Sequence, residues 1–264
     1  MSETAKPKKR RFLKAELLVL VCVICIWFVK SETIGITSIT AGVLKQVVKI
    51  YPDSADAHRL LGDVYFDSDR RFDAIEAYEK AIKINPRDDI AYANLGDAYD
   101  SVCLFEEAIE AYEKAIQINP NDADSRFGLG EAYFDSEEYE KAIESYKQAI
   151  KLNPDDFMSH YSLGIAYDWL DRYEEQIPAF KEAIRIDPHD ADAHTCLGDA
   201  YLNLEKYEEA IGAYEEAVRL RPDDSYSHLM LGNAYYDANR PEDAIKSYTT
   251  AIGLNPDCSD AHLN

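Results

Sequence analysis

Seven prolines divide this chain of 264 residues at a constant interval of 34 residues. They are Pro52, Pro86, Pro120, Pro154, Pro188, Pro222 and Pro256. A fixed period of this length is typical of a solenoid, in which copies of one small unit stack so that each contacts only its neighbours. The period therefore predicts an array of repeats rather than a globular domain with a single core.

The residues that recur inside each 34-residue unit indicate a pair of helices. Counted from Ala55, position 7 is leucine, position 8 glycine and position 11 tyrosine in all six units, and position 20 is alanine in five. The glycines are Gly62, Gly96, Gly130, Gly164, Gly198 and Gly232. Position 24 is aromatic throughout: Tyr78, Tyr112, Tyr146, Phe180, Tyr214 and Tyr248. Residues four apart share one helix face, so positions 7 and 11 mark a first helix and positions 20 and 24 a second.

This pattern predicts a helical hairpin with an aromatic core in each unit. Small residues at positions 8 and 20 allow the two helices to approach closely, and the aromatic rings fill the remaining space. The second helix is expected to end before the recurring proline, because the residue that precedes a proline is disfavoured in the helical conformation.

The repeated Leu-Gly-x-x-Tyr and Ala-x-x-x-Tyr motifs, followed by Asn-Pro or Asp-Pro in most units, resemble the tetratricopeptide repeat (TPR) family. The resemblance covers residues 55–258 fully and 41–54 in part, and it implies an all-α fold, a right-handed α-solenoid of TPR hairpins. The predicted repeats are 55–88, 89–122, 123–156, 157–190, 191–224 and 225–258. Residues 31–54 are expected to be a linker and a degenerate half repeat with its helix at 41–50, and residues 259–264 match the opening of an incomplete seventh repeat.

Two departures from the family pattern stand out. The family often has tryptophan near the start of the first helix, at position 4, which we call the opening position. Here it holds His58, Tyr92, Arg126, His160, His194 and His228. We interpret the histidines as helix-packing substitutes rather than metal ligands, because they lie on successive hairpins. The fourth repeat has Gln176 and Pro178, and a proline inside a helix removes a hydrogen bond, so its second helix is expected to be bent.

The N-terminal residues indicate a membrane anchor. A basic stretch in residues 1–11 is followed by an apolar segment at 12–30, which is long enough to span a bilayer if Lys14 and Glu16 reach back to the headgroups. Small residues suited to signal cleavage do not follow it, so we favour an uncleaved transmembrane or signal-anchor helix, with secretion after cleavage as the alternative. The bases before the segment predict a single-pass protein with a cytoplasmic N-terminus and repeats on the non-cytoplasmic side.

The charge of the chain limits its partners. Acidic residues outnumber basic ones by 50 to 28, which disfavours nucleic acid as a partner because its binding depends on neutralising phosphates. The five cysteines have no metal-ligand spacing, and no cofactor or metal site is predicted.

The resemblance implies that first helices line a concave, peptide-binding groove with positions 2, 5, 9, 12 and 13 facing inward. These positions hold twelve acids, seven aromatic residues and one base, Arg59. The predicted groove residues are Asp63, Phe66, Asp97, Asp100, Phe127, Glu131, Phe134, Tyr161, Asp168, Trp169, Asp199 and Tyr236. Such a groove suits a protein segment that carries Lys or Arg. The alternative interpretation is that the acids simply keep the helix faces solvated.

The predicted function is a membrane-anchored scaffold or adaptor that binds other proteins. No catalytic set of residues stands apart from the repeat framework, so the chain is not expected to be an enzyme. Two alternatives remain: a structural scaffold that self-assembles through an uncapped C-terminal hairpin, and the truncated targeting arm of a larger TPR enzyme such as a glycosyltransferase.

Overall fold

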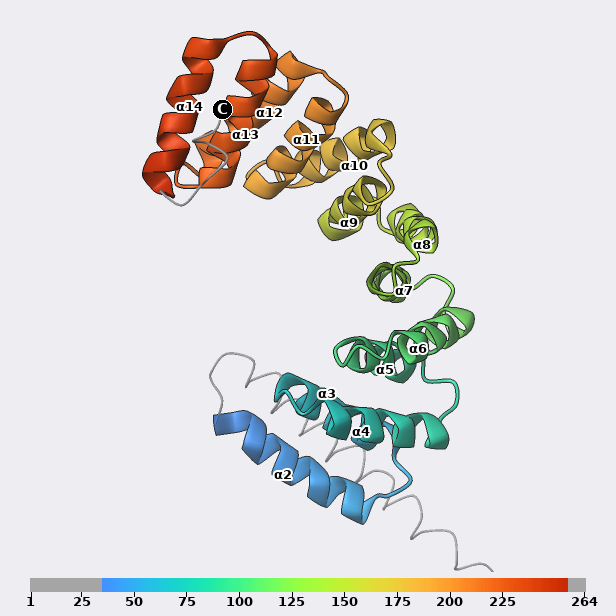
Figure 1. Ribbon diagram of the computed structural model, residues 1–264. Helices are drawn as coiled ribbons and strands as arrows, with labels where there is room; N and C mark the ends of the chain where they lie inside the picture. The colour runs from blue at the N-terminus through green and yellow to red at the C-terminus, as the bar shows by residue number, and fades with distance from the viewer. Residues whose placement is uncertain (1–34, 256–264) are drawn as a thin grey trace, which may run out of the picture. The chain divides into compact units, whose positions relative to one another are not determined.

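The computed structural model describes residues 35–255, and this part of the chain is made of thirteen helices joined by short turns (Figure 1). The all-α prediction is confirmed for these residues. The helices are α2 Gly35–Ile50, α3 Ala55–Asp67, α4 Arg71–Ile84, α5 Asp89–Asp100, α6 Phe105–Ile118, α7 Ala123–Asp135, α8 Tyr139–Leu152, α9 Phe157–Asp168, α10 Tyr173–Ile186, α11 Ala191–Asn203, α12 Tyr207–Leu220, α13 Ser225–Asp237 and α14 Pro241–Leu254.

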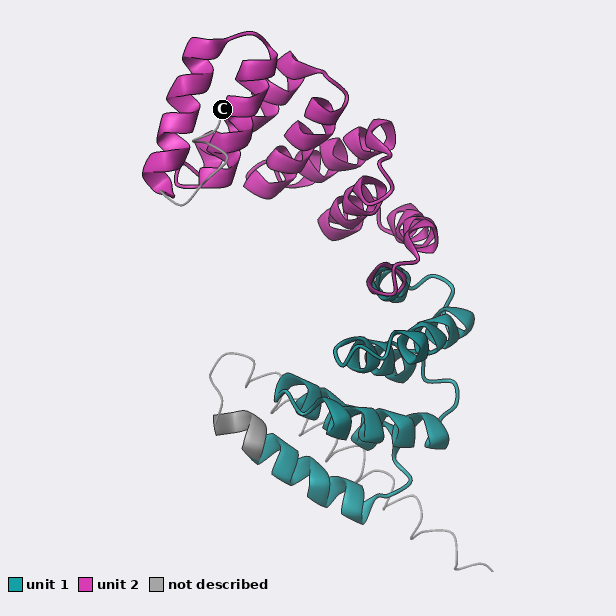
Figure 2. Ribbon diagram, in the orientation of Figure 1, with its two compact units in different colours: residues 1–132 teal, residues 133–264 magenta. Residues whose placement is uncertain are grey.

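The chain divides into two compact units, and the division falls inside α7, between Ala132 and Tyr133 (Figure 2). In unit 1, α3 packs against α4 and α5 against α6, and α4 also contacts α5. In unit 2, α9 pairs with α10, α11 with α12 and α13 with α14, and each pair contacts the next through its second helix. Each unit is therefore a stack of helical hairpins, as the repeat pattern predicts.

Helix α2 covers the first hairpin of unit 1. It buries Ala41, Leu44 and Val47 in the same core cluster as α3 and α4. The predicted half-repeat helix at 41–50 is thus present, and it begins earlier, at Gly35.

The first helices begin at a side chain that caps their free backbone N–H groups. Five caps accept a hydrogen bond from the backbone three residues later: Ser54, Asp88, Asp156, Asp190 and Asp224. An aspartate in this place also complements the positive end of the helix dipole. Part of the excess of acid in the sequence is therefore structural.

The turn inside each hairpin depends on one residue in the left-handed conformation. These residues are Asp69, Cys103, Glu137, Asp171, Glu205 and Asn239, with φ between 54° and 63°. The backbone N–H of the following residue donates to the carbonyl five residues before it, as Arg70 does to Tyr65 at 2.9 Å. This is the Schellman arrangement that satisfies the last carbonyls of a helix, and here it is made without glycine.

The opening-position side chains bond to the turn before them. The Nε2 atoms of four histidines lie 3.0–3.3 Å from the carbonyl oxygen of the proline six residues earlier, to which they donate. These histidines are His58, His160, His194 and His228. Arg126 donates in the same way to Pro120 at 2.8 Å. These contacts give the four histidines a structural role at the start of their hairpins.

Pro178 lies inside α10, which is continuous from Tyr173 to Ile186 and has 14 residues, as α8 and α12 do. The proline therefore does not end the helix. The bend that the sequence predicts at this point stays a prediction.

The predicted membrane anchor at 12–30 and the basic tail at 1–11 lie outside the described residues, as do residues 259–264. Within residues 35–255, no helix combines the length and the apolar character that crossing a bilayer requires.

Candidate functional site

The structure places the predicted groove residues on the first helices of both units, except for Trp169, which directly follows α9. It gives several of the acids a partner in the core. In unit 1, Asp63 accepts hydrogen bonds from the Tyr78 hydroxyl at 3.0 Å and from the Asn94 amide at 2.8 Å. Asp97 accepts from the Tyr112 hydroxyl at 2.6 Å. Both carboxylates therefore hold the aromatic ring that fills the space between two helices.

Unit 2 repeats this contact with one informative change. Asp199 accepts from the Tyr214 hydroxyl at 2.5 Å, and Asn233 accepts from Tyr248 at 2.8 Å. In the fourth repeat both partners are apolar, because Ile165 and Phe180 occupy the two positions. Position 9 and the ring at position 24 thus form one structural pair in these repeats, although the sequence pattern predicted position 9 only as part of the groove. The joint change to Ile165 and Phe180 was a signal in the sequence.

The Asp199 carboxyl is the most strongly perturbed of these acids. Burial raises its pKa from 3.8 to about 6, although the hydrogen bond from Tyr214 opposes the rise; the charge of Asp168 adds to it. Burial also raises the pKa of Asp63, against the lowering effects of Tyr78, Arg59 and Asn94. These acids are more readily protonated than exposed carboxylates.

Replacing Asp199 with asparagine is expected to raise stability at pH 7 by about 1 kcal/mol, after discounting the shift for solvent screening. Because the folded-state pKa is raised, the folded protein holds a proton between about pH 4 and pH 6 that the unfolded chain has lost, and stability falls as pH rises through that window. Asparagine removes this dependence of stability on pH. Its side-chain oxygen can still accept a hydrogen bond from Tyr214, as that of Asn233 does from Tyr248. Denaturant unfolding at pH 5 and pH 7 measures the effect.

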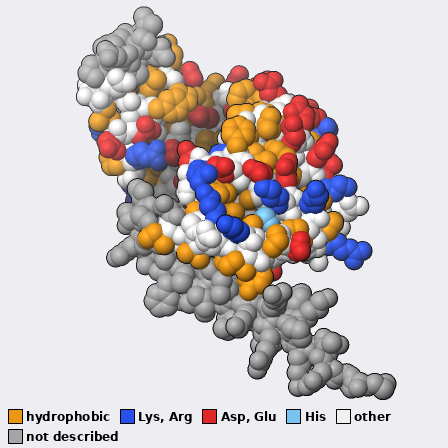
Figure 3. Space-filling model, turned by 90° about the horizontal axis from the view of Figure 1, so that it is seen from below, with side chains coloured by type: hydrophobic (Ala, Val, Ile, Leu, Met, Phe, Trp, Pro, Cys, Tyr) orange, Lys and Arg blue, Asp and Glu red, His pale blue; other side chains and the backbone are white. Residues whose placement is uncertain are grey.

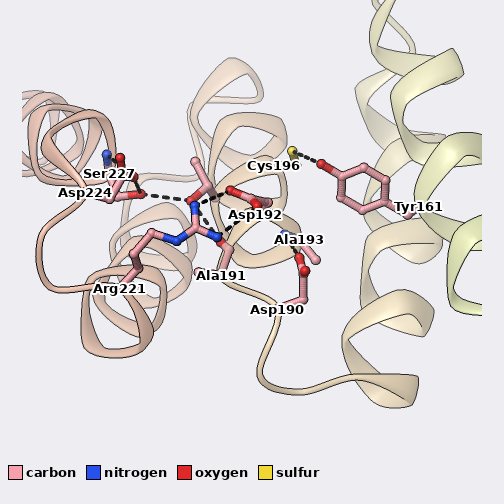
Figure 4. Close-up of polar contacts among 10 residues, drawn as sticks. Tyr161, Asp190, Ala191, Asp192, Ala193, Cys196, Arg221, Asp224 and Ser227 are labelled. Carbon is pink, nitrogen blue, oxygen red and sulfur yellow. Dashed lines mark hydrogen bonds and ion pairs between the residues drawn. The ribbon is translucent and has the colours of Figure 1, made fainter. Parts of the chain in front are cut away.

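Asp192 is the matched control for this prediction, because its pKa is shifted in the opposite direction. Arg221 donates to both of its carboxylate oxygens, at 2.7 and 2.9 Å (Figure 4), and lowers the pKa. Asp192→Asn is expected to lose stability at pH 7 rather than gain it. Equal effects of the two substitutions would contradict the assignment of a raised pKa to Asp199.

Aromatic side chains form a partly exposed cluster in unit 2. Trp169, 61 % exposed, stacks on Tyr139 with ring centroids 5.5 Å apart, and Phe134 meets both rings edge-on. The structure thus brings together Phe134 and Trp169, two predicted groove residues, and adds Tyr139 from α8, which the sequence did not single out.

The other aromatic residues of the prediction differ in how open they are. Tyr161 stacks on Phe157 and meets Phe180 edge-on, and its hydroxyl lies 3.8 Å from the Cys196 sulfur on α11 (Figure 4). Tyr236 is 60 % exposed. In unit 1, the Arg71 guanidinium covers the Phe66 ring at 4.0 Å. Phe66 therefore already has a cation, whereas Tyr236 presents its ring to solvent.

Three further predicted residues in unit 1, Asp100, Phe127 and Glu131, are half-buried on α5 and α7. In unit 2, Asp168 is exposed and accepts a hydrogen bond from the Gln176 amide at 3.2 Å. Across the face drawn in Figure 3, acidic side chains lie beside hydrophobic ones, with lysine and arginine sharing the surface. The acids are therefore of two kinds: those that hold a core tyrosine and those, such as Asp168, that do not.

Family models match most of the repeat region. Models described as TPR repeat or tetratricopeptide repeat match residues 73–100, 105–136, 130–168, 159–190, 179–212, 198–239 and 225–258. The chain belongs to the tetratricopeptide repeat family. Because the matches begin at residue 73, after the first helix of the first predicted repeat, the count of six repeats stays a prediction.

Solved TPR structures resemble this one closely. YrrB, described as a TPR protein with an unusual peptide-binding site, is 25 % identical with a TM-score of 0.66, over 72 % of this chain and 97 % of its own. MamA is 28 % identical with a TM-score of 0.61, over 65 % of this chain and 93 % of its own. PilF of Pseudomonas aeruginosa, 18 % identical with a TM-score of 0.64 over 79 % of this chain and 95 % of its own, shows the fold alone. No curated protein matches the sequence. The chain is a TPR-type protein-interaction scaffold.

Proposed function

We propose that this TPR protein is a membrane-anchored adaptor whose first helices bind a basic peptide segment of another protein. The observation that carries the proposal is the joint presence of exposed acids and exposed aromatic rings at the inward positions, with Asp168, Trp169 and Tyr236 as examples. Acids favour Lys and Arg by charge, and aromatic faces attract the same side chains. The likeness to YrrB, a TPR protein with a peptide-binding site, supports peptide recognition.

The position of the arginines agrees with this choice of ligand. Arg70, Arg172, Arg219 and Arg240 each pair with an acid three residues away on their own helix or turn. Such local pairs neutralise few of the 50 acids in the chain, which leaves a surface with a large excess of negative charge. A basic segment would therefore be attracted at long range, and its binding would weaken as salt increases.

The membrane anchor and the absence of catalysis belong to the same proposal. The apolar segment at 12–30 supports a single-pass protein whose N-terminus is cytoplasmic and whose repeats lie on the other side. Resistance of the full-length chain to alkaline extraction from membranes, lost on deletion of residues 1–30, tests the anchor. We infer a non-enzymatic role because no catalytic set of residues stands apart from the repeat framework, and because Asp199, whose pKa burial raises to about 6, is already engaged by Tyr214.

Binding is tested with the full-length chain in mild detergent and an arginine-serine peptide as the probe. The variant Asp67→Lys, Asp135→Lys, Asp237→Lys reverses three exposed acids that end α3, α7 and α13. We expect it to weaken binding about tenfold or more through lost charge pairing and repulsion.

The control reverses three exposed acids on second helices, Glu106→Lys, Glu174→Lys and Glu209→Lys, which alters net charge equally. It is expected to bind more tightly than the first variant. No binding by the native chain, or equal losses in both variants, would reject recognition by the first helices. A stable complex of the chain with its own copies alone would instead favour the self-assembling scaffold.

A further inference from the structure

The fourth repeat contains a buried polar side chain that stability does not explain. Gln176 on α10 is 1 % exposed and occupies position 20, where the other five repeats have alanine. Its Nε2 atom donates to Asp168, but its Oε1 atom is buried without a hydrogen-bond partner among the described residues. A buried acceptor without a donor costs about 1–3 kcal/mol, which alanine would avoid. A cost of this kind points to a role for the amide.

The glutamine acts on the end of α9. Asp168 is the last residue of that helix, and the Gln176 amide holds its exposed carboxylate from the buried side at 3.2 Å. The negative end of the helix dipole lies at the same place and favours a cation there. Asp168 also raises the pKa of Asp199 on α11 and of Tyr226 on α13, so these groups lie close enough to interact.

At this end of α9 the Arg172 guanidinium lies over the Tyr167 ring and pairs with Glu175, not with Asp168. Among the ion pairs of residues 35–255, none includes Asp168 or Asp199, whereas nearby Asp192 is paired with Arg221. The position next to Asp168 is Trp169, which stacks one face on Tyr139 and is 61 % exposed. Tryptophan is the aromatic side chain that attracts cations most strongly. Carboxylate and indole thus belong to consecutive residues at the end of α9, and the Gln176 amide holds the carboxylate.

We propose that Asp168 and Trp169 form a binding site for one arginine side chain of the partner segment, with Gln176 as the residue that positions Asp168. The inference rests on the proposed peptide-binding function and names the repeat and the side chain on which recognition depends. Arginine fits better than lysine because its planar guanidinium stacks on an indole face while it donates two hydrogen bonds to a carboxylate. The other repeats lack the tryptophan and the glutamine at these positions.

Trp169 provides a local readout, because the chain has two tryptophans and the variant Trp27→Phe leaves Trp169 alone. In this background, the full-length chain in mild detergent is titrated with the arginine-serine peptide and with peptides in which lysine or neutral citrulline replaces arginine. We expect the arginine peptide to change Trp169 emission and to bind about tenfold more tightly than the lysine peptide. The citrulline peptide should leave the emission unchanged.

The positioning role is tested with Gln176→Met, which keeps the volume of the side chain and removes the amide. We expect about fivefold weaker arginine binding and a loss of the preference over lysine, with thermal stability unchanged or higher because the unpartnered acceptor is gone. Gln117→Ala, on the exposed face of α6, is the control and should change neither.

The outcomes separate this site from the broader proposal. If the peptide binds but leaves Trp169 emission unchanged, or if Gln176→Met binds as tightly as the native chain, the site in the fourth repeat is wrong and binding by first helices stands. If lysine binds as well as arginine, the assignment to arginine is overturned. If no peptide binds at all, the proposed function fails together with the site.

Discussion

Replacing Tyr214 with alanine is expected to lower the free energy of unfolding by about 4 kcal/mol, the loss typical of a large aromatic residue in a core. The Tyr214 side chain is 0 % exposed and belongs to the core cluster that α11, α12 and α13 share. Its removal leaves a cavity between α11 and α12 and takes away the donor to Asp199. Denaturant unfolding of the full-length chain, followed by circular dichroism, measures the loss.

The hydroxyl and the ring of Tyr214 are separated by two further variants. Tyr214→Phe keeps the ring and leaves the half-buried Asp199 carboxylate without its donor, which is expected to cost about 1–2 kcal/mol. Adding Asp199→Ile recreates the Ile165 and Phe180 pair of the fourth repeat and should recover most of that loss. A double variant that is less stable than Tyr214→Phe alone would show that positions 9 and 24 are not one unit.

The helical framework was predictable because its determinants are local and recur. A glycine at position 8 and a ring at position 24 appear in every unit, and the structure brings the members of five such pairs together, among them Gly62 with Tyr78 and Gly164 with Phe180. The hairpin turns were harder to predict from the sequence. Glycine is the usual signal of a left-handed residue, but this chain uses residues such as Glu137 and Cys103 instead, so the Schellman turns could not be identified from residue type.

The candidate site was predictable only as a set of inward positions. Asp63, Asp97 and Asp199 share position 9, and Asp168 is at position 12, but the sequence shows each of them only as an acid on a first helix. Their contacts depend on which side chain the second helix places opposite each acid, and for the three acids at position 9 it is a tyrosine hydroxyl. Asp168 lacks such a tyrosine and is held by Gln176 instead. The sequence marked Gln176 as a departure but gave no indication of its contact.

Replacing Gly62 with alanine is the second change with a large expected effect, a loss of about 2–3 kcal/mol from overpacking. A Cβ atom at this position would lie 2.4 Å from Cε1 and 2.6 Å from Cδ1 of Tyr78. The Tyr78 ring cannot readily move away, because it is 2 % exposed and its hydroxyl is bonded to Asp63. The helices α3 and α4 would have to separate.

Gly42 on α2 is the control, because a Cβ atom there meets nothing within 4 Å. Alanine has the higher helix propensity, so Gly42→Ala should stabilise the chain by about 0.5–1 kcal/mol, opposite in sign to Gly62→Ala. Thermal unfolding compares the two variants directly. Opposite signs would mean that position 8 is glycine because the ring at position 24 occupies the space of a side chain. A gain in both would mean that the hairpin can loosen without cost, and that the close approach of its helices is not what stabilises the repeat.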